Sequence, residues 1–302
     1  MRDKIVKKLC FIFLTSFGLV FFSTLIKAQE IEVESVFETI EVSRTLAPLN
    51  FQTNQIIEQY IAYYQGRGRQ SIQAILFRSS RHEKMIRRIF SEEGVPEDLS
   101  WMQQLVVESG GTTGWNYIRP LWFFTPNIAR KYGLQKTKYL DETKSFEKAT
   151  RAMAQYLKFL YHKYNKNWEM ALGAYKSGEG NVDYAIKRAK TKDYWKIYQY
   201  LPRETRNFVP NVLAAILIAN NPQEYNFTEV KKDSSFEYEL FRIPPSVSLE
   251  RIAEYAGTDI KFIKQINPEL ISNLTPPKPY IIRVPMGSGQ IFAQRMRSLL
   301  SK

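Results

Sequence analysis

Glu108 is the residue in this sequence that is best suited to acid catalysis. It lies at the end of a segment that begins at Pro96 and stops at a pair of glycines, a pattern that predicts a helix. On the last turn, the negative end of the helix dipole disfavours a carboxylate, and burial beside Trp101 or Trp115 would do the same. Both effects raise the pKa of the carboxyl group, which could therefore stay protonated and donate a proton.

Other common catalytic groups are scarce. The histidines are His82 and His162, and we interpret both as solvated surface residues. A histidine-based zinc cluster or a Ser-His-Asp triad is therefore hard to assemble. The single cysteine, Cys10, lies in the N-terminal apolar segment, which excludes a disulfide scaffold in the mature protein. The sequence implies no metal ion and no organic cofactor.

Residues 1–28 have the layout of an export signal. Basic residues come first, the apolar run Leu9–Ile26 follows, and Ala28 is a suitable cleavage point. Because the run is long for a cleaved signal, an uncleaved membrane anchor is the alternative. We expect an exported protein of the periplasm or cell envelope, with a membrane anchor left open.

The formal net charge of the chain is +13 at pH 7, which favours anionic partners. For an exported protein these are anionic lipid or cell-wall polymer rather than nucleic acid, and no base-reading motif is present. The alternative explanation is that the positive charge only keeps the protein soluble. We therefore expect no nucleic-acid partner and leave association with the membrane or envelope surface open.

Apolar residues at three- and four-residue spacing predict a mainly helical domain over residues 50–228. An acidic, extended lead-in over residues 29–49 precedes it. The predicted helical segments are Asn54–Gln65, Gln70–Phe90, Pro96–Glu108, Pro126–Gly133, Ser145–Tyr164, Trp168–Tyr175, a helix capped by Asn181 after a loop over Lys176–Gly180, and Glu204–Ala219.

The polar run 229–235 marks a linker and a domain boundary. Beyond it, residues 236–302 are predicted to form a small α+β domain in the order strand, helix, helix, strand, followed by a C-terminal tail. The strands are expected near Phe236–Leu240 and Tyr280–Val284. Ser248 and Asp259 are expected to cap the helices between them.

Four segments of the helical part stand in an order and at a spacing typical of one family. They are Gly94–Leu99 with Val107–Ser109, Pro126–Leu134, Ala171–Val182 and Leu201–Pro210. Together they resemble the lytic transglycosylases with a goose-type lysozyme-like (SLT) domain, especially the membrane-bound type D group. The resemblance implies a lysozyme-like helical fold that binds the glycan strands of peptidoglycan. It also implies cleavage of the bond between N-acetylmuramic acid and N-acetylglucosamine, with an intramolecular 1,6-anhydro product.

The resemblance implies roles for several residues, with Glu108 as the catalytic acid and base. Tyr175 corresponds to a tyrosine that faces the catalytic carboxyl group and the substrate, and a core aromatic is the alternative. Ser109 and Glu204 match residues of the substrate groove, although Glu204 could instead be a solvated helix start. Gly178 would let a glycan approach the backbone, or would simply form a turn between helices.

A single carboxyl group could carry out this chemistry. No acidic residue lies between Glu108 and Asp141. Most glycosidases need two carboxyl groups, whereas substrate-assisted enzymes use the acetamido group of the sugar as the nucleophile. Because Glu179 or Glu204 could approach Glu108 in space, the one-carboxylate mechanism stays a hypothesis.

The loop 110–124 departs from the family pattern where the substrate is gripped. It is shorter than usual, and Phe123 stands where glutamine is expected. Either Asn116 or Thr113 replaces the lost hydrogen bond to the N-acetyl group, or turnover is poor. Trp115, Tyr117 and Trp122 could stack on sugar faces, with hydrophobic packing as an equal alternative. The rival hypothesis is therefore a weak or inactive glycan-binding or envelope-assembly protein on the same fold. A third hypothesis is a muramidase that cleaves the same polymer by hydrolysis.

The C-terminal part resembles a LysM module. The resemblance rests on Ile266–Leu270 and Pro276–Pro285, with Pro245–Ser248 where Gly-Asp-Thr is usual. It implies that this part binds glycan, and a packing appendage is the alternative.

Overall fold

The structure, a computed structural model, describes residue 49 and residues 51–109, 120–228, 231–235 and 237–300, without the side chains of 107–109 and 299–300. All of these residues belong to the unit Val33–Lys302. The predicted export signal and the lead-in up to residue 48 lie outside the described residues, and so do the loop residues Thr113, Trp115, Asn116 and Tyr117. None of the helices within the described ranges is long and apolar enough to cross a membrane.

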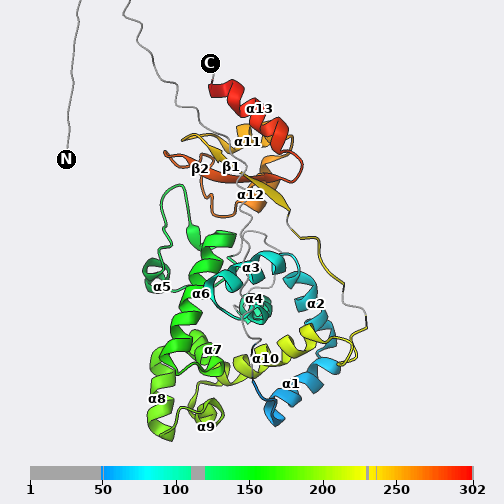
Figure 1. Ribbon diagram of the computed structural model, residues 1–302, viewed down its shortest axis with the longest axis vertical. Helices are drawn as coiled ribbons and strands as arrows, with labels where there is room; N and C mark the ends of the chain where they lie inside the picture. Colours follow the sequence, from blue (N-terminus) through cyan, green and yellow to red (C-terminus); the bar gives the residue numbers. More distant parts are fainter. Residues whose placement is uncertain (1–48, 50, 110–119, 229–230, 236, 301–302) are drawn as a thin grey trace, which may run out of the picture. The chain divides into compact units, whose positions relative to one another are not determined.

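Helices follow one another along residues 55–220, which we call the helical domain (Figure 1). They are α1 (Gln55–Gln65), α2 (Arg69–Ser79), α3 (Glu83–Glu93), the 3₁₀ turn η1 (Glu97–Trp101), α4 (Met102–Ser109), α5 (Pro126–Lys131), η2 (Glu142–Lys144), α6 (Phe146–Lys163), α7 (Trp168–Ser177), α8 (Glu179–Ala189), α9 (Tyr194–Ile197), η3 (Tyr198–Tyr200) and α10 (Arg203–Asn220).

Side-chain caps fix the starts of several of these helices. The Oδ1 atom of Asn54 accepts hydrogen bonds from the N–H groups of Ile56 at 3.0 Å and Ile57 at 3.1 Å. Likewise, Oδ1 of Asn167 accepts a hydrogen bond from the N–H group of Met170 at 2.7 Å. Each bond satisfies a backbone donor that the first turn of a helix leaves unpaired. The predicted helix starts at Asn54 and Asn167 are therefore confirmed.

Two predicted helices differ from the structure in how they begin or continue. The stretch Gln70–Phe90 is broken at Ser80–His82, which separates α2 from α3. The helix expected from Pro96 starts as the 3₁₀ turn η1 and becomes α-helical only at Met102. Helix ends commonly tighten into 3₁₀ turns. Because η1 continues directly into α4, the segment still forms one helical stretch that ends at Ser109.

The loop predicted over Lys176–Gly180 is shorter than expected. Gly178 has a φ of +83° and ends α7, and α8 begins at the next residue. Asn181 therefore lies inside α8 and does not cap it. Its Nδ2 group instead donates a hydrogen bond to the carbonyl oxygen of Ser177 at 2.7 Å.

His82 is buried and not solvated, which corrects the prediction made from the sequence. Its side chain is 9% exposed, and its ring centroid lies 4.5 Å from that of Phe146. Burial, with the positive charge of Arg81 as a second cause, lowers the pKa of His82 to about 3. The basic neighbours of His82 indicated solvent, but packing against α6 removes it from water. His162 is exposed, as predicted.

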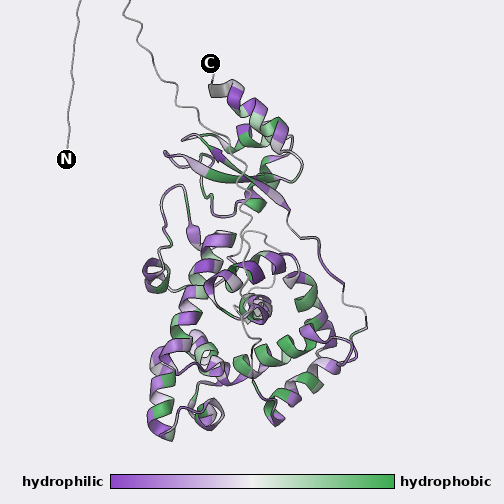
Figure 2. Cartoon of the chain, viewed as in Figure 1, coloured by the Kyte–Doolittle hydropathy of each residue, from purple (hydrophilic) through white to green (hydrophobic). Residues whose placement is uncertain are grey.

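Helix α4 is the central helix of the helical domain. Figure 1 shows it end-on with α2, α3, α6, α7 and α10 around it, and it contacts α2, η1 and α10. Its residues Met102, Leu105 and Val106 are buried. Helix α10, which is largely hydrophobic along its length (Figure 2), also packs against α1 and α7. The hydrophobic core thus holds α4 in place through its contact with α10.

Residues 238–300 form a small α+β unit, which we call the C-terminal module. The strands β1 (Tyr238–Ile243) and β2 (Tyr280–Pro285) pair in antiparallel orientation, with Tyr238 opposite Pro285. The helices α11 (Leu249–Ala256) and α12 (Ile260–Ile266) lie between the strands, and α13 (Gly289–Leu300) follows them. The mainly helical part and the small strand, helix, helix, strand part confirm the predicted fold class. Helix α13 was not predicted, because its sequence was interpreted as a tail.

The segment between α5 and η2 joins the helical domain to the C-terminal module. Leu140 pairs with Leu270, and its side chain belongs to the hydrophobic core of the module. The N–H group of Asp141 donates a hydrogen bond to the carbonyl oxygen of Glu269 at 2.8 Å. Both apolar packing and backbone hydrogen bonds therefore connect the two parts.

Candidate active site

Glu108 lies on the last turn of α4, one residue before the helix ends at Ser109. The structure describes the backbone of these two residues and not their side chains. The turn before them is buried, since Leu105 is 5% and Val106 4% exposed. The end of a buried helix is where the helix dipole and desolvation would raise the pKa of a glutamate.

Helix α10 connects the elements that carry Glu108, Tyr175 and Glu204. It contacts both α4 and α7, and Glu204 lies in its first turn. Phe208, four residues further on, lies on the same side of α10 as Glu204. The ring centroid of Phe208 is 6.0 Å from that of Tyr175. The structure thus brings Tyr175 next to the start of α10, where the exposed Glu204 lies.

Tyr175 lies in a row of aromatic rings, between Phe208 and Tyr156. Its ring centroid is 6.5 Å from that of Tyr156, which in turn is 5.6 Å from that of Tyr132. Burial raises the pKa of the Tyr175 hydroxyl, so that it stays protonated near neutral pH. A protonated hydroxyl can donate a hydrogen bond to a carboxylate or a sugar oxygen. The sequence did not single out Tyr156, because its helical spacing is that of a core residue.

Glu179 does not offer a free second carboxylate. It lies in the first turn of α8, and its Oε1 atom is 2.6 Å from Nζ of Lys163 on α6. Its negative charge also affects Tyr156 in the aromatic row. Burial is the main cause that raises the pKa of Tyr156 to about 12, and the charge of Glu179 is the second. Glu179 is therefore engaged in an ion pair beside the row.

Gly178 joins α7 to α8 and is exposed. Its φ of +83° is one that residues with a side chain rarely adopt, which explains the glycine as a turn residue. A Cβ atom at this position would meet no described atom within 4 Å. No atom of the described residues therefore blocks the predicted approach of a glycan to this backbone.

Trp122 is a core residue and does not offer a face to sugars. It is fully buried, and its ring stacks on that of Phe90 with a centroid distance of 5.7 Å. Its Nε1 group donates a hydrogen bond to Oγ1 of Thr150 at 2.9 Å. Of the two interpretations left open by the sequence, hydrophobic packing is correct. The adjacent Phe123, where glutamine was expected, is 44% exposed.

Comparison with known proteins supports the family resemblance. Residues 116–198 match the model of the transglycosylase SLT domain, and residues 238–300 match that of the lytic transglycosylase MltD, LysM-like domain. The first of these segments contains Tyr175 and Gly178, whereas Glu108 and Glu204 lie outside it.

Two curated relatives match parts of this chain. The membrane-bound lytic murein transglycosylase D of Escherichia coli K12 is 30% identical over 151 residues, which are 49% of this chain and 33% of the relative. A putative tributyltin chloride resistance protein of Alteromonas sp. strain M-1 is 30% identical over 89 residues, which are 30% of this chain and 43% of that protein. The chain thus spans less than half the length of either relative. It contains a transglycosylase SLT domain followed by an MltD-type LysM-like domain, and it is homologous to membrane-bound lytic murein transglycosylase D.

Proposed function

We propose that this protein is a lytic transglycosylase that cleaves the bond between N-acetylmuramic acid and N-acetylglucosamine in peptidoglycan. The observation that carries the proposal is the position of Glu108 on the last turn of the buried central helix α4. A glutamate held there is suited to stay protonated in the resting enzyme. The SLT match and the relative named a lytic murein transglycosylase support this class of reaction.

The proposed mechanism uses one carboxyl group twice. Glu108 first donates its proton to the glycosidic oxygen, and the bond from that oxygen to C1 of the muramic acid breaks. The acetamido group of the same sugar attacks C1 and replaces an enzyme nucleophile. The Glu108 carboxylate then removes the proton of the 6-hydroxyl group, whose oxygen bonds to C1 and displaces the acetamido oxygen. The 1,6-anhydro ring forms and Glu108 regains its proton.

The residues around Glu108 are assigned supporting roles in this proposal. The protonated hydroxyl of Tyr175 would orient the Glu108 carboxyl group or the N-acetyl group. Ser109, Glu204 and Gly178 would line the groove for the glycan. The ion pair of Glu179 with Lys163 supports a mechanism in which Glu179 is not a second catalytic carboxylate.

Trp115 and Asn116 are proposed to complete the substrate groove from the loop 110–119. Trp115 would stack on a sugar ring, and Asn116 would supply the hydrogen bond to the N-acetyl group that glutamine supplies in the family pattern. The domain division at residues 229–235, glycan binding by the C-terminal module, and a place in the periplasm or cell envelope, with or without membrane attachment, belong to the same proposal.

The rival function is a glycan-binding or envelope-assembly protein that has lost turnover, and the exposed Phe123 in place of glutamine favours it. Product analysis separates the hypotheses. The protein is incubated with purified sacculi, and the released muropeptides are identified by mass spectrometry. Anhydro-muropeptides support the proposed function, and products with a reducing end support a hydrolytic muramidase. Release of neither, with tight binding to sacculi, supports the rival.

A further inference from the structure

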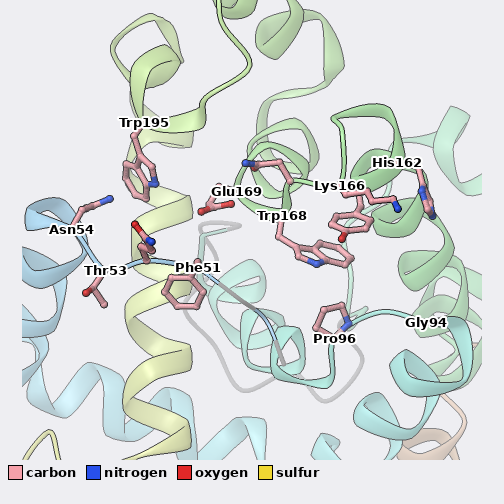
Figure 3. A pocket seen from close by; sticks show the side chains of 13 residues that line it. Phe51, Thr53, Asn54, Gly94, Pro96, His162, Lys166, Trp168, Glu169 and Trp195 are labelled. Atoms are coloured by element: carbon pink, nitrogen blue, oxygen red, sulfur yellow. The ribbon is translucent and has the colours of Figure 1, made fainter. Parts of the chain in front are cut away.

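A pocket of about 920 Å³ opens in the helical domain where several helices begin (Figure 3). Its walls come from segments far apart in the sequence: the residues before α1, the turn before η1, the end of α6 with the loop after it, the start of α7, and α9. Its volume lies within the range typical of ligand sites. Neither the motifs nor the helical spacing of the sequence indicated it.

The pocket is separate from the proposed catalytic site. Pro96 lines it at the start of η1, whereas Glu108 lies at the far end of α4. The rise per residue puts these ends about 20 Å apart along the axis. In the same way Trp168 lines the pocket at the start of α7, and Tyr175 lies about two turns further along that helix.

Aromatic rings form much of the pocket wall. Tyr161 and Trp168 are stacked, with their ring centroids 4.2 Å apart and an angle of 19° between the planes. Trp195 lines the pocket from α9, and Phe51 from the segment before α1. Figure 3 shows the Glu169 side chain between Trp195 and Trp168. Trp168 is only 9% exposed and borders the pocket from the core, whereas the half-buried Trp195 offers its indole beside the carboxylate. An indole next to a carboxylate can hold a ring-shaped ligand with polar edges.

Glu169 has no cation partner among the described residues. Burial, with Asp193 as a further cause, raises the pKa of its carboxyl group. A partly desolvated carboxyl group without an ion pair costs free energy, which a ligand with hydrogen-bond donors would offset. Asn54 adds a donor to the same wall, because its Oδ1 atom caps α1 and its Nδ2 group makes no hydrogen bond within the described part of the chain.

The rim of the pocket carries a positive charge at Lys166. This residue has a φ of +59°, and the preceding Asn165 has a φ of +56°. A left-handed conformation is uncommon for lysine and costs free energy, yet it holds the loop between α6 and α7 at the rim. An exposed lysine disfavours a cationic ligand and suits a neutral or anionic one.

We propose that this pocket is a second glycan-binding site, which takes an N-acetylated hexosamine unit of the peptidoglycan strand. The half-buried indole of Trp195 packs against the sugar ring, the stacked pair of Tyr161 and Trp168 borders it, Glu169 accepts hydrogen bonds from its hydroxyl or amide groups, and Lys166 faces the carboxylates of the strand. The ligand class rests on the proposed function. A strand bound both here and at Glu108 would dissociate more slowly than one bound at either site.

The test follows the tryptophan indole N–H signals by NMR during titration with a soluble tetramer of N-acetylglucosamine. The chain has five tryptophans, and Trp195→Phe identifies the signal of Trp195. The titration uses the full chain carrying Glu108→Gln, so that no tetramer is consumed. We expect saturable shifts of the Trp168 and Trp195 signals. Unmoved signals of these two residues at saturating tetramer would overturn the proposal.

Variants of the pocket give a second readout. Trp195→Ala and Glu169→Gln should each weaken tetramer binding at the pocket about tenfold, as read from the Trp168 signal. The matched control is Tyr184→Ala, because Tyr184 is an aromatic residue on α8 that is 58% exposed and does not line the pocket. Equal affinity of all three variants would contradict the proposal.

The pocket and the proposed function can fail separately. Release of anhydro-muropeptides by the wild type, together with unmoved Trp168 and Trp195 signals, would refute the pocket alone. Saturable shifts of these two signals without any muropeptide release would refute the proposed enzymatic activity and support glycan binding in the pocket.

Discussion

Arg283 on β2 forms an ion pair with Glu147 in the first turn of α6, and so links the C-terminal module to the helical domain. The side chains are 6% and 25% exposed, respectively. The guanidinium group also contacts Glu269 at 2.7 Å, and the Tyr238 hydroxyl donates a hydrogen bond to Glu147. Burial opposes the charge of Glu147, but Arg283 and these hydrogen bonds outweigh it and hold the pKa of Glu147 at about 2.

Replacing Arg283 should destabilise the protein strongly. Arg283→Met leaves Glu147 and Glu269 buried without their partner, and removal of one member of a buried pair costs about 3–5 kcal/mol. The control is Lys196→Met, whose pair with Asp193 is exposed (72% and 43%) and contributes less than about 1 kcal/mol. Urea unfolding followed by fluorescence measures both. An Arg283→Met variant as stable as the control would show that this ion pair does not stabilise the contact between the C-terminal module and the helical domain.

His82 should make stability depend on pH in a defined window. Its pKa is 6.5 when unperturbed and about 3 in the folded protein, so the unfolded chain binds a proton that the folded chain does not. Its stabilising contribution is complete above pH 6.5 and is lost as the pH falls toward 3, by up to about 1.4 kcal/mol per pH unit. His82→Phe should flatten the stability profile between pH 6.5 and 5. The exposed His162 is the control, and His162→Gln should leave the slope in place.

Trp122 should contribute to stability and not to glycan affinity. Trp122→Phe keeps an aromatic ring against Phe90 but removes the hydrogen bond to Thr150 and leaves a cavity, with a cost of about 1–3 kcal/mol. The dissociation constant for the soluble tetramer should remain that of the wild type. A weaker tetramer affinity at unchanged stability would contradict the assignment of Trp122 to the core.

Tyr175 should act through its hydroxyl group. Tyr175→Phe keeps the ring contacts with Tyr156 and Phe208, so the free energy of unfolding should change by less than about 1 kcal/mol. Turnover of peptidoglycan should fall about 10- to 100-fold, because the hydroxyl no longer orients the reacting groups. Tyr184→Phe on the exposed face of α8 is the control. Equal rates for the two variants would show that Tyr175 serves packing alone.

The sequence could predict features that depend on neighbouring residues. Asn54 and Asn167 cap helices through backbone groups two or three positions away, so residue type and local spacing were sufficient. The alternation around Tyr238 and the caps at Ser248 and Asp259 located the elements of the C-terminal module for the same reason.

Features formed by distant segments could not be predicted from local patterns. His82 has basic neighbours along the chain, but its burial comes from Phe146 on another helix. The pocket unites Phe51, Trp168 and Trp195, whose spacing along the chain carries no signal of their proximity. Helix α13 was missed although Phe292 and Met296 have helical spacing, because the preceding strand was interpreted as the closing element.

The most direct test of the central claim compares two glutamates in the digestion of purified sacculi. Glu108→Gln cannot donate or accept the proton, and we expect the release of anhydro-muropeptides to fall by about 10²- to 10⁴-fold. Glu179→Gln loses only its ion pair with Lys163 and should release them at close to the wild-type rate. Wild-type release by a folded Glu108→Gln variant, or loss of release in a folded Glu179→Gln variant, would contradict a mechanism that depends on Glu108 alone.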